Sequence, residues 1–319
     1  YGSQLIKTPN LDRMALEGAR LDSFYSSANV CTAARGGLLT GRYPIRLDLV
    51  SDVARPTNSV HLASEEISLA EALKPLGYKT ALFGKWHLGS RLEWSPLTQG
   101  FDEYFGVLHS NDMTPLELYR QEKMIENPVN QNTLTERYTN EAIRFIQDNQ
   151  DDPFFLYMPH TFPHVPLYVS NQFSGKSGAG LYGDVVETID WSVGQILKTL
   201  ERLKIEKDTL VLFTSDNGPW ASKGKAGGVS GPLRGSKGCT LEGGVREPTI
   251  AWWPGTIAPG TESAGIAGTT DVLPTFVSLA GGKVKKDIRI DGVDVSKWML
   301  GKTETSPRKT WHYFRGTRL

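Results

Sequence analysis

The chain has 319 residues, of which 39% are hydrophobic and 22% are charged. This is an ordinary globular composition, long enough for one large core or for two domains. Lysine plus arginine and aspartate plus glutamate both number 35, so the chain lacks the excess positive charge that favours nucleic acid or an anionic membrane surface as a partner. A site for an anion must therefore come from a local gathering of cations.

The predicted elements alternate between helix and strand, which favours an α/β sheet covered on both faces. In chain order they are a helix opening at 8–9, a strand at 19–24, a helix opening with a capping box at 68–71, a strand at 79–83, a helix opening with a second box at 133–136, a strand at 154–157, a helix at 185–203, strands at 210–213 and 249–253, and a helix at 271–280. The glycine-rich segment 218–244 is predicted to be a long loop.

Polar motifs follow four of the predicted strands: the loop with Cys31 follows the strand at 19–24, and His160 and His164 follow the strand at 154–157. Lys85 and His87 follow the strand at 79–83, and Asp216 follows the strand at 210–213. Ligand sites in open α/β sheets lie beyond the carboxyl ends of the strands. We therefore expect these motifs to converge on one pocket.

The segment 31–42, Cys-Thr-Ala-Ala-Arg-Gly-Gly-Leu-Leu-Thr-Gly-Arg, places a thiol at a predicted helix start. A helix N-terminus favours negative charge at this position, and Arg35, one turn further on, lies on the same helix face as Cys31. The bare pattern is also compatible with a buried thiol beside a surface arginine. A disulfide with Cys239, the other cysteine of the chain, is a further alternative.

Two other motifs suggest ligands. Asp216 and Asn217 offer two hard oxygens on one turn, which suits Ca²⁺ or Mg²⁺, although an Asx turn that closes the strand would explain them as well. Lys85 and His87 point the same way on an extended chain, so a cation and an imidazole can face one anion.

Taken together, these segments resemble the type I, formylglycine-dependent sulfatases, which are arylsulfatase-like members of the alkaline phosphatase superfamily. Segment 31–42 matches their maturation signature, and the resemblance extends from residue 8 to residue 275. It implies a large mixed β-sheet sandwiched between helices, in a catalytic domain over residues 1–305 that lacks its first strand. Residues 306–319 would begin a truncated C-terminal α+β subdomain.

The resemblance also implies a set of site residues. Cys31 would be oxidised to formylglycine, and position 31 would bind Ca²⁺, or Mg²⁺, together with Asp216, Asn217 and an Asp-Asp pair from a strand before Tyr1. The implied catalytic residues are Cys31, Arg35, Lys85, His87, His164 and Lys237. A His-x-Pro context selects His164 over His160, and Ser110 is a candidate contact for the leaving group.

The implied reaction is hydrolysis of a sulfate ester. One hydroxyl of the hydrated aldehyde attacks sulfur, while Lys85, His164 and Lys237 neutralise charge on the sulfuryl oxygens. Lys237 and His164 then assist the departing alcohol. Finally, His87 takes a proton from the second hydroxyl, so that the aldehyde reforms and sulfate leaves.

Three alternatives stay open at this point: a phosphoester or phosphonate hydrolase of the same superfamily, a catalytically inactive sugar-binding relative, and a nonenzymatic protein with a redox thiol. The expected partners are a sulfated small molecule or saccharide and a formylglycine-generating maturation enzyme, with no nucleic acid and no membrane span. The sequence contains no Asn-x-Ser/Thr glycosylation acceptor, which favours a bacterial enzyme exported to the periplasm or the medium.

Overall fold

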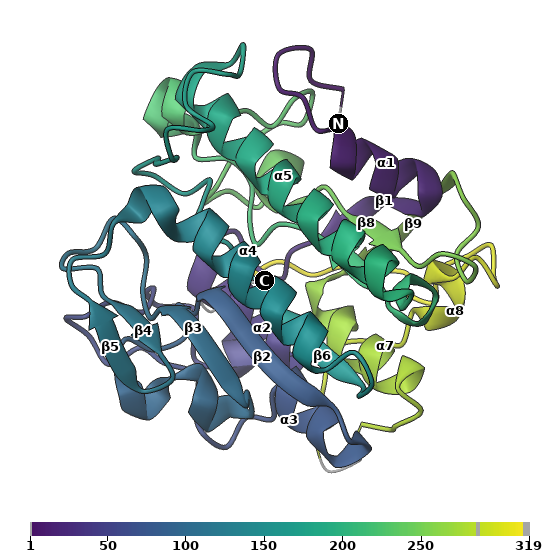
Figure 1. The fold of residues 1–319 in the computed structure, drawn as a ribbon. Helices are drawn as coiled ribbons and strands as arrows, with labels where there is room; N and C mark the ends of the chain where they lie inside the picture. The colour runs from purple at the N-terminus through teal and green to yellow at the C-terminus, as the bar shows by residue number, and fades with distance from the viewer. Residues whose placement is uncertain (1, 285–287, 315–319) are drawn as a thin grey trace.

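A computed structural model describes residues 2–284 and 288–314 of the chain. It is a mixed α/β structure with helices on both faces of the strands, as the sequence predicts (Figure 1). The strands are β1 (Ala19–Tyr25), β2 (Lys79–Lys85), β3 (Glu103–Val107), β4 (Leu118–Arg120), β5 (Lys123–Glu126), β6 (Phe154–Tyr157), β7 (Val211–Phe213), β8 (Ile250–Trp252) and β9 (Thr261–Gly268). The α-helices are α1 (Pro9–Glu17), α2 (Cys31–Thr40), α3 (Leu69–Leu73), α4 (Leu134–Asp148), α5 (Gly180–Leu203), α6 (Glu242–Val245), α7 (Val272–Leu279) and α8 (Ser296–Met299).

The described strands form two hydrogen-bonded sheets, where the sequence predicts one. Their orders are β5-β4-β3-β2-β6 and β7-β8-β1-β9. Both sheets are mixed, because β2 is parallel to β3 and β6 while β4 is antiparallel to β3, and β1 is parallel to β9 but antiparallel to β8. The edge strands β6 and β7 both line a cavity of about 1990 Å³, which separates the two sheets.

Helices cover the strands in two layers (Figure 1). On one face α4 and α5 pack over β2 and β3 through Phe83, Phe105 and Tyr138, and α1 joins α5 over β8. On the other face α2, α3 and α7 pack through a second apolar cluster that includes Leu39, Leu69 and Leu273. The two layers hold the carboxyl ends of β2, β6 and β7 in fixed positions.

Local sequence signals explain several helix starts. α1 begins at Pro9, whose fixed φ suits a first turn. The predicted capping box of α3 is present, since Ser68 Oγ accepts from Glu71 N at 3.1 Å and Ser68 N donates to Glu71 Oε2 at 2.9 Å. The box predicted at 133–136 is wrong: Thr133 Oγ1 donates to the carbonyl of Asn130 at 2.9 Å, in the 3₁₀ turn that precedes α4, and does not cap the helix.

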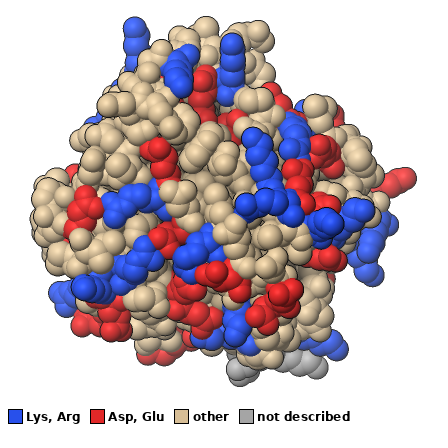
Figure 2. Space-filling model, in the orientation of Figure 1, with Lys and Arg blue, Asp and Glu red and all other residues tan. Residues whose placement is uncertain are grey.

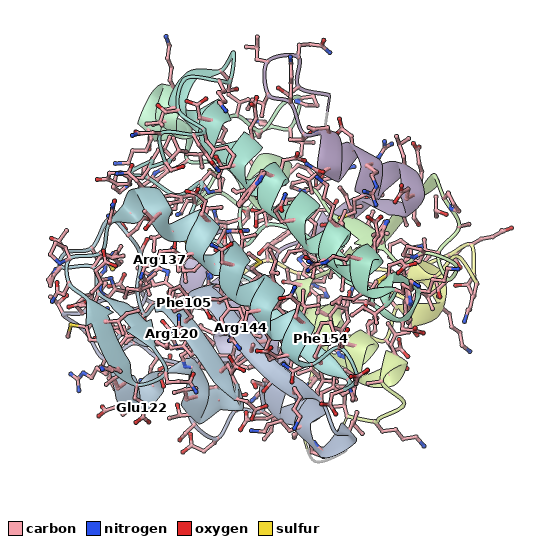
Figure 3. The ribbon with its side chains drawn as sticks, viewed as in Figure 1. Phe105, Arg120, Glu122, Arg137, Arg144 and Phe154 are labelled. Carbon is pink, nitrogen blue, oxygen red and sulfur yellow. The ribbon has the colours of Figure 1, made fainter. Side chains whose placement is uncertain are left out.

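The outer surface of β3 is covered by arginine side chains. The guanidinium groups of Arg120 and Arg137 lie 4.7 and 5.5 Å from the ring centroid of Phe105, and Figure 3 shows both with Arg144 around the crossing of α4 and β3. Each guanidinium also has a carboxylate partner. The ion pairs are Arg120–Glu141, Arg137–Glu126 and Arg144–Glu103. These cations are therefore neutralised locally and do not form an anion site.

The C-terminal segment 306–314 contains no helix or strand and packs on the rest of the molecule. Arg308 forms a buried ion pair with Asp271, just before α7, and the Trp311 ring lies 6.3 Å from that of Tyr25 and 5.6 Å from that of Tyr43. That 306–319 begins a separate subdomain stays a prediction, and 315–319 lie outside the described residues. Among the described helices, none has the length and apolar character needed to span a bilayer.

Candidate active site

Cys31 is the first residue of α2 and is buried, with 4% of its surface exposed. The positive end of the helix dipole favours negative charge at this position. The ammonium group of Lys237 donates to Cys31 Sγ at 3.3 Å. Cys31 and Cys239 are both free thiols, so the disulfide alternative is not realised. The thiol thus lies between a helix N-terminus and a cation.

The rest of the 31–42 signature positions α2. A Cβ on Gly36 would lie 2.6 Å from Leu49 Cδ1, and one on Gly37 would lie 2.1 Å from Ser27 Oγ. Gly41 ends the helix with φ of 68°, a conformation that favours glycine. These glycines let α2 approach its neighbours closely, and this approach fixes the place of Cys31.

Arg35 joins three elements of the site. Its Nε and Nη2 lie 3.0 and 2.9 Å from Asp216 Oδ2, and its Nη1 donates to the carbonyl of Lys85 at 2.6 Å. Burial raises the pKa of Asp216, but the positive charges of Arg35, Lys85 and Lys237 together lower it by more than burial raises it. The pKa of Asp216 therefore lies below its usual value. Asp216 is therefore ionised at neutral pH.

Lys85 ends β2, with 1% of its surface exposed, and its Nζ donates to Ser110 Oγ at 3.1 Å. Burial lowers the pKa of Lys85, and the charge of Arg35 lowers it as well, while Cys31 opposes both. An anion at this position would relieve the repulsion among the cations.

His164 lies on the other side of Ser110. Its Nδ1 lies 2.7 Å from the carbonyl oxygen of Val165 and 3.2 Å from Asn111 Oδ1. A carbonyl oxygen accepts only, so Nδ1 carries a proton and Nε2 is bare in the neutral ring. Burial, followed by the charges of Lys85 and Lys237, lowers the pKa of His164 to about 3. The ring is thus neutral unless an anion offsets those charges.

His87 has a free ring nitrogen. Its Nε2 lies 3.0 Å from the carbonyl oxygen of Ala54 and so donates to it, while Nδ1 is buried without a described partner. Its backbone has φ of 60°, unusual for a residue with a side chain. Burial, then Lys85 and Arg35, lower the pKa of His87 well below its usual value. A neutral imidazole with a bare nitrogen is suited to accept a proton.

Asp216 and Asn217 provide oxygens that suit a hard cation. Asn217 Nδ2 donates to the carbonyl of Gly218 at 2.9 Å, and Oδ1 is buried without a described partner. A buried amide oxygen without a donor is costly, and a cation would satisfy it. Within the described part of the chain no group of three or more His, Cys, Asp or Glu residues is placed to hold a metal. The described ligands therefore fit Ca²⁺ or Mg²⁺ but do not complete its coordination.

Contacts among the predicted residues connect them into one cluster at the ends of β2, β6 and β7. Lys237 contacts Cys31, Lys85 contacts Ser110, and Ser110 Oγ lies 3.4 Å from His164 Nδ1. His160 lines the large cavity, and its Nδ1 has no described partner. Convergence of the motifs on one site is what the strand-end argument predicts.

Some residues of the site were not selected from the sequence. The Trp220 ring lies between two predicted residues, with its centroid 4.7 Å from Lys237 Nζ and 5.5 Å from that of the His164 ring. Asn111 is almost fully buried and orients His164. The sequence held one signal for Trp220 and Asn111, namely that they lie close in the chain to Asp216 and Ser110. Loop residues follow no hydrophobic periodicity that would indicate their position.

Glu247 is a further buried group, with 3% exposure and an Oε1 atom that has no described partner. Burial, then the nearby charge of Asp216, raise its pKa to about 8. In the sequence it stands between Arg246 and Pro248, a context that suggests a surface loop. Nothing in that pattern indicates its burial.

The fold and the site define a class of protein: a mixed α/β protein in which positively charged side chains form a site for an anion, beside a turn whose side-chain oxygens suit a metal ion. Comparison with known proteins identifies the family. The Sulfatase family model matches residues 1–282. The chain therefore belongs to the sulfatase family.

Individual relatives agree with this assignment. The chain is 43% identical to N-acetylgalactosamine-6-sulfatase from Mus musculus over 98% of its own residues, but spans 65% of that protein's length. It is 37% identical to arylsulfatase A from Homo sapiens, covering 98% of this chain and 67% of the relative. Among solved structures, the PsFucS1 sulfatase from Pseudoalteromonas sp. superposes with a TM-score of 0.91 at 30% identity, covering 99% of this chain and 70% of the other.

The expected localisation does not hold. The sequence argument favours a bacterial exported enzyme because the chain lacks an N-glycosylation acceptor, yet the two curated relatives above are mammalian. The absence of one short motif constrains source too weakly to stand against similarity over nearly the whole chain.

Proposed function

We propose that the protein hydrolyses sulfate esters and that Cys31 is converted to formylglycine by a maturation enzyme. One observation carries the proposal: Cys31 begins α2 with the ammonium of Lys237 at 3.3 Å from its sulfur, next to the buried Arg35 and Lys85. Three cations around one reactive position suit a tetrahedral oxyanion. The hydrated aldehyde would supply the nucleophilic hydroxyl.

Side-chain contacts suggest the role of each residue. Lys85 and Lys237 bind the sulfuryl oxygens, and Ser110 lies where it can contact the leaving group. His164 gains its proton when the anion offsets the neighbouring ammonium charges, and then donates it from Nε2 to the departing alcohol. His87 uses its bare Nδ1 to take a proton from the residue at position 31. Arg35 orients Asp216 through the ion pair.

A divalent cation, Ca²⁺ or Mg²⁺, would polarise the sulfate and the hydroxyl when bound. Asp216, Asn217 and the residue at position 31 would hold it. Asn217 Oδ1, which is buried and has no described partner, supports this assignment.

We further propose that the cavity between β6 and β7 takes one more β-strand, which precedes Tyr1 and brings the missing carboxylates. The cavity is apolar on both sides, with Ile189 and Val193 from α5 on one and Val272 and Phe276 from α7 on the other. It reaches the turn that carries Asp216. A buried strand presents apolar side chains to both faces and its last residues to the site.

The proposed substrates are sulfated saccharides, and esters of N-acetylgalactosamine 6-sulfate come first, because the mouse relative is named for that group. The full-length protein, produced with a maturation enzyme, would be assayed with that sugar sulfate and with 4-nitrophenyl sulfate and phosphate. A preference for sulfate is expected. A clear preference for the phosphate ester would support a phosphoester hydrolase instead.

Cys31→Ser tests the nucleophile, because a serine ester has no second hydroxyl through which to expel sulfate. The variant should keep substrate affinity and make no more than one turnover. Cys239→Ser is the matched control, since this exposed thiol lies outside the cluster, and it should keep full activity. Mass spectrometry of the wild-type peptide should show a loss of about 18 Da at Cys31, the change from a thiol to an aldehyde. Repeated turnover by Cys31→Ser would end the proposal.

A further inference from the structure

A second cavity, of about 630 Å³, adjoins the proposed active site. It shares Val165, Tyr182 and Ala226 with the large cavity, so the two cavities are neighbours. Asp112, Lys223 and Lys225 are the charged residues among those that line it. The cavity is therefore placed to receive the part of a substrate that extends away from the reacting sulfate.

The two lysines lie on η7 (Ala221–Ala226), the short green helix at the upper left of Figure 1, near the start of α5. Lys and Arg side chains are visible at this end of the molecule in Figure 2, with fewer Asp and Glu side chains among them than on the lower part of that face. Both lysines are exposed, and within the described residues neither forms an ion pair. The whole chain carries no net charge. The excess of positive charge on this loop is therefore a local feature and does not reflect the composition of the chain.

Trp220 connects the lysines to the catalytic cluster. Its ring centroid lies 4.6 Å from Lys223 Nζ and 4.7 Å from Lys237 Nζ. One indole ring therefore contacts both an ammonium group that donates to Cys31 and an ammonium group of the second cavity. Because both ammonium groups lie within 4.7 Å of the centroid of the same ring, two anionic groups on one sugar or on adjacent sugars can reach both.

Close contacts hold the loop in place. Trp220 N donates to the carbonyl of Gly227 at 2.9 Å, and Gly227 N donates to that of Gly224 at 2.9 Å. A Cβ on Gly228 would lie 2.3 Å from the Tyr182 hydroxyl, so the loop lies directly against α5. A preorganised pair of lysines loses less freedom on binding than a mobile pair would.

We propose that this cavity is a subsite for a second anionic group of the substrate, a sulfate or a carboxylate carried by a saccharide. The inference rests on the proposed sulfatase function and deepens it, since it predicts multiply anionic saccharides over simple aryl sulfates. Lys223 and Lys225 bind the second anion. Pro166 and Tyr182 provide apolar surface for a sugar ring, and Asp112 accepts from its hydroxyls.

The test compares substrates with and without the second anion, and the disaccharide and its methyl ester differ in that charge alone. The full-length matured enzyme would be assayed with the methyl glycoside of N-acetylgalactosamine 6-sulfate, with the disaccharide in which glucuronate is attached, and with the methyl ester of that disaccharide. A second disaccharide would carry a sulfate in place of the carboxylate. Wild type should favour the two dianionic disaccharides through a lower KM, and these two arms distinguish carboxylate from sulfate.

Lys223→Gln/Lys225→Gln should remove that preference. Loss of charge-assisted hydrogen bonds should lower kcat/KM for the dianionic substrates by about 10- to 100-fold, mainly through KM, and leave the monosaccharide and the methyl ester within about twofold of wild type. Lys198→Gln, an exposed lysine on α5, is the matched control and should change nothing. A loop that was merely destabilised would affect every substrate alike, so the ratio between substrates reports the subsite itself.

Two results would overturn the inference while leaving the sulfatase proposal intact: equal loss on all substrates, or no loss on any of them. If wild type hydrolyses none of the substrates, the sulfatase proposal fails. Calorimetric binding of the desulfated glucuronate disaccharide then decides the subsite: binding that the double lysine variant abolishes supports it, and binding that is absent or unchanged by the variant refutes it.

Discussion

Replacement of Arg35 should be among the most damaging single changes to the stability of the protein. The side chain is 6% exposed and contacts both Asp216 and the carbonyl of Lys85. Arg35→Gln leaves the Asp216 carboxylate without its main counter-charge. Breaking a buried ion pair from one side costs about 3–5 kcal/mol, and because Asp216 is 25% exposed, solvent screening favours about 3 kcal/mol.

Arg35→Lys separates charge from geometry. It keeps the positive charge, but a single ammonium cannot reproduce the fork that reaches Asp216 and the Lys85 carbonyl together. Loss of one charge-assisted hydrogen bond predicts a cost of about 2 kcal/mol. A double-mutant cycle with Asp216→Leu would isolate the coupling, and the double variant should be more stable than the sum of the single losses predicts.

The assay is urea unfolding of the purified protein, with chelator and with calcium. The loss should be larger in chelator, because a bound cation gives Asp216 a second counter-charge. Arg55→Gln is the control: Arg55 pairs with Asp52 at side-chain exposures of 46% and 48%, and the loss should stay below about 1 kcal/mol. If Arg35→Gln costs no more than Arg55→Gln, the argument from burial is refuted.

Three further outcomes are expected. Gly37→Ala places a methyl group 2.1 Å from Ser27 Oγ and should lower the free energy of unfolding by about 1–3 kcal/mol. Gly178→Ala is the control: the nearest atom to its new methyl group lies at 3.4 Å, so the free energy of unfolding should change by no more than about 0.5 kcal/mol. Similar losses for both variants would contradict the close-packing argument. Burial lowers the pKa of His160 from its usual 6.5 to about 4. The unfolded chain therefore binds the proton first, and the free energy of unfolding should fall as the pH drops from 6.5 to 4, by no more than about 3 kcal/mol. His160→Gln should reduce this fall, and an unchanged pH profile would show that the ring is solvated. Because burial and the lysine charges hold the pKa of His164 near 3, NMR should find it neutral at pH 6, with a pKa that rises by at least about one unit when sulfate binds; a pKa insensitive to sulfate would remove His164 from the anion site.

Several of the predicted site residues, such as Lys85 and Asp216, lie in short motifs directly after an apolar strand. Strand ends of a sheet meet at one edge, so the placement of Lys85 and Asp216 near each other followed from order along the chain. The same reasoning could not find Trp220 or Lys223. They lie in a loop whose path is set by long-range contacts such as that of Gly228 against Tyr182, and no local pattern encodes these.

The fold was predictable in class but less so in detail. β9 was missed because its sequence, Thr-Glu-Ser-Ala-Gly-Ile-Ala-Gly, has few β-branched or aromatic residues. Small residues are needed there, since a Cβ on Gly265 would lie 2.8 Å from the Trp298 indole nitrogen. The single predicted sheet is divided because no described strand joins β6 to β7.

That division has a practical consequence for anyone who expresses residues 1–319 alone. The facing edges of β6 and β7 expose backbone donors and acceptors that can recruit any extended chain, including another copy of the molecule, which is a recognised route to aggregation. Such material should precipitate readily. A synthetic peptide with apolar side chains that adopts an extended conformation, added during refolding, should pair with the same edges and keep the protein in solution. Strand donation between subunits works in the same way in other assemblies.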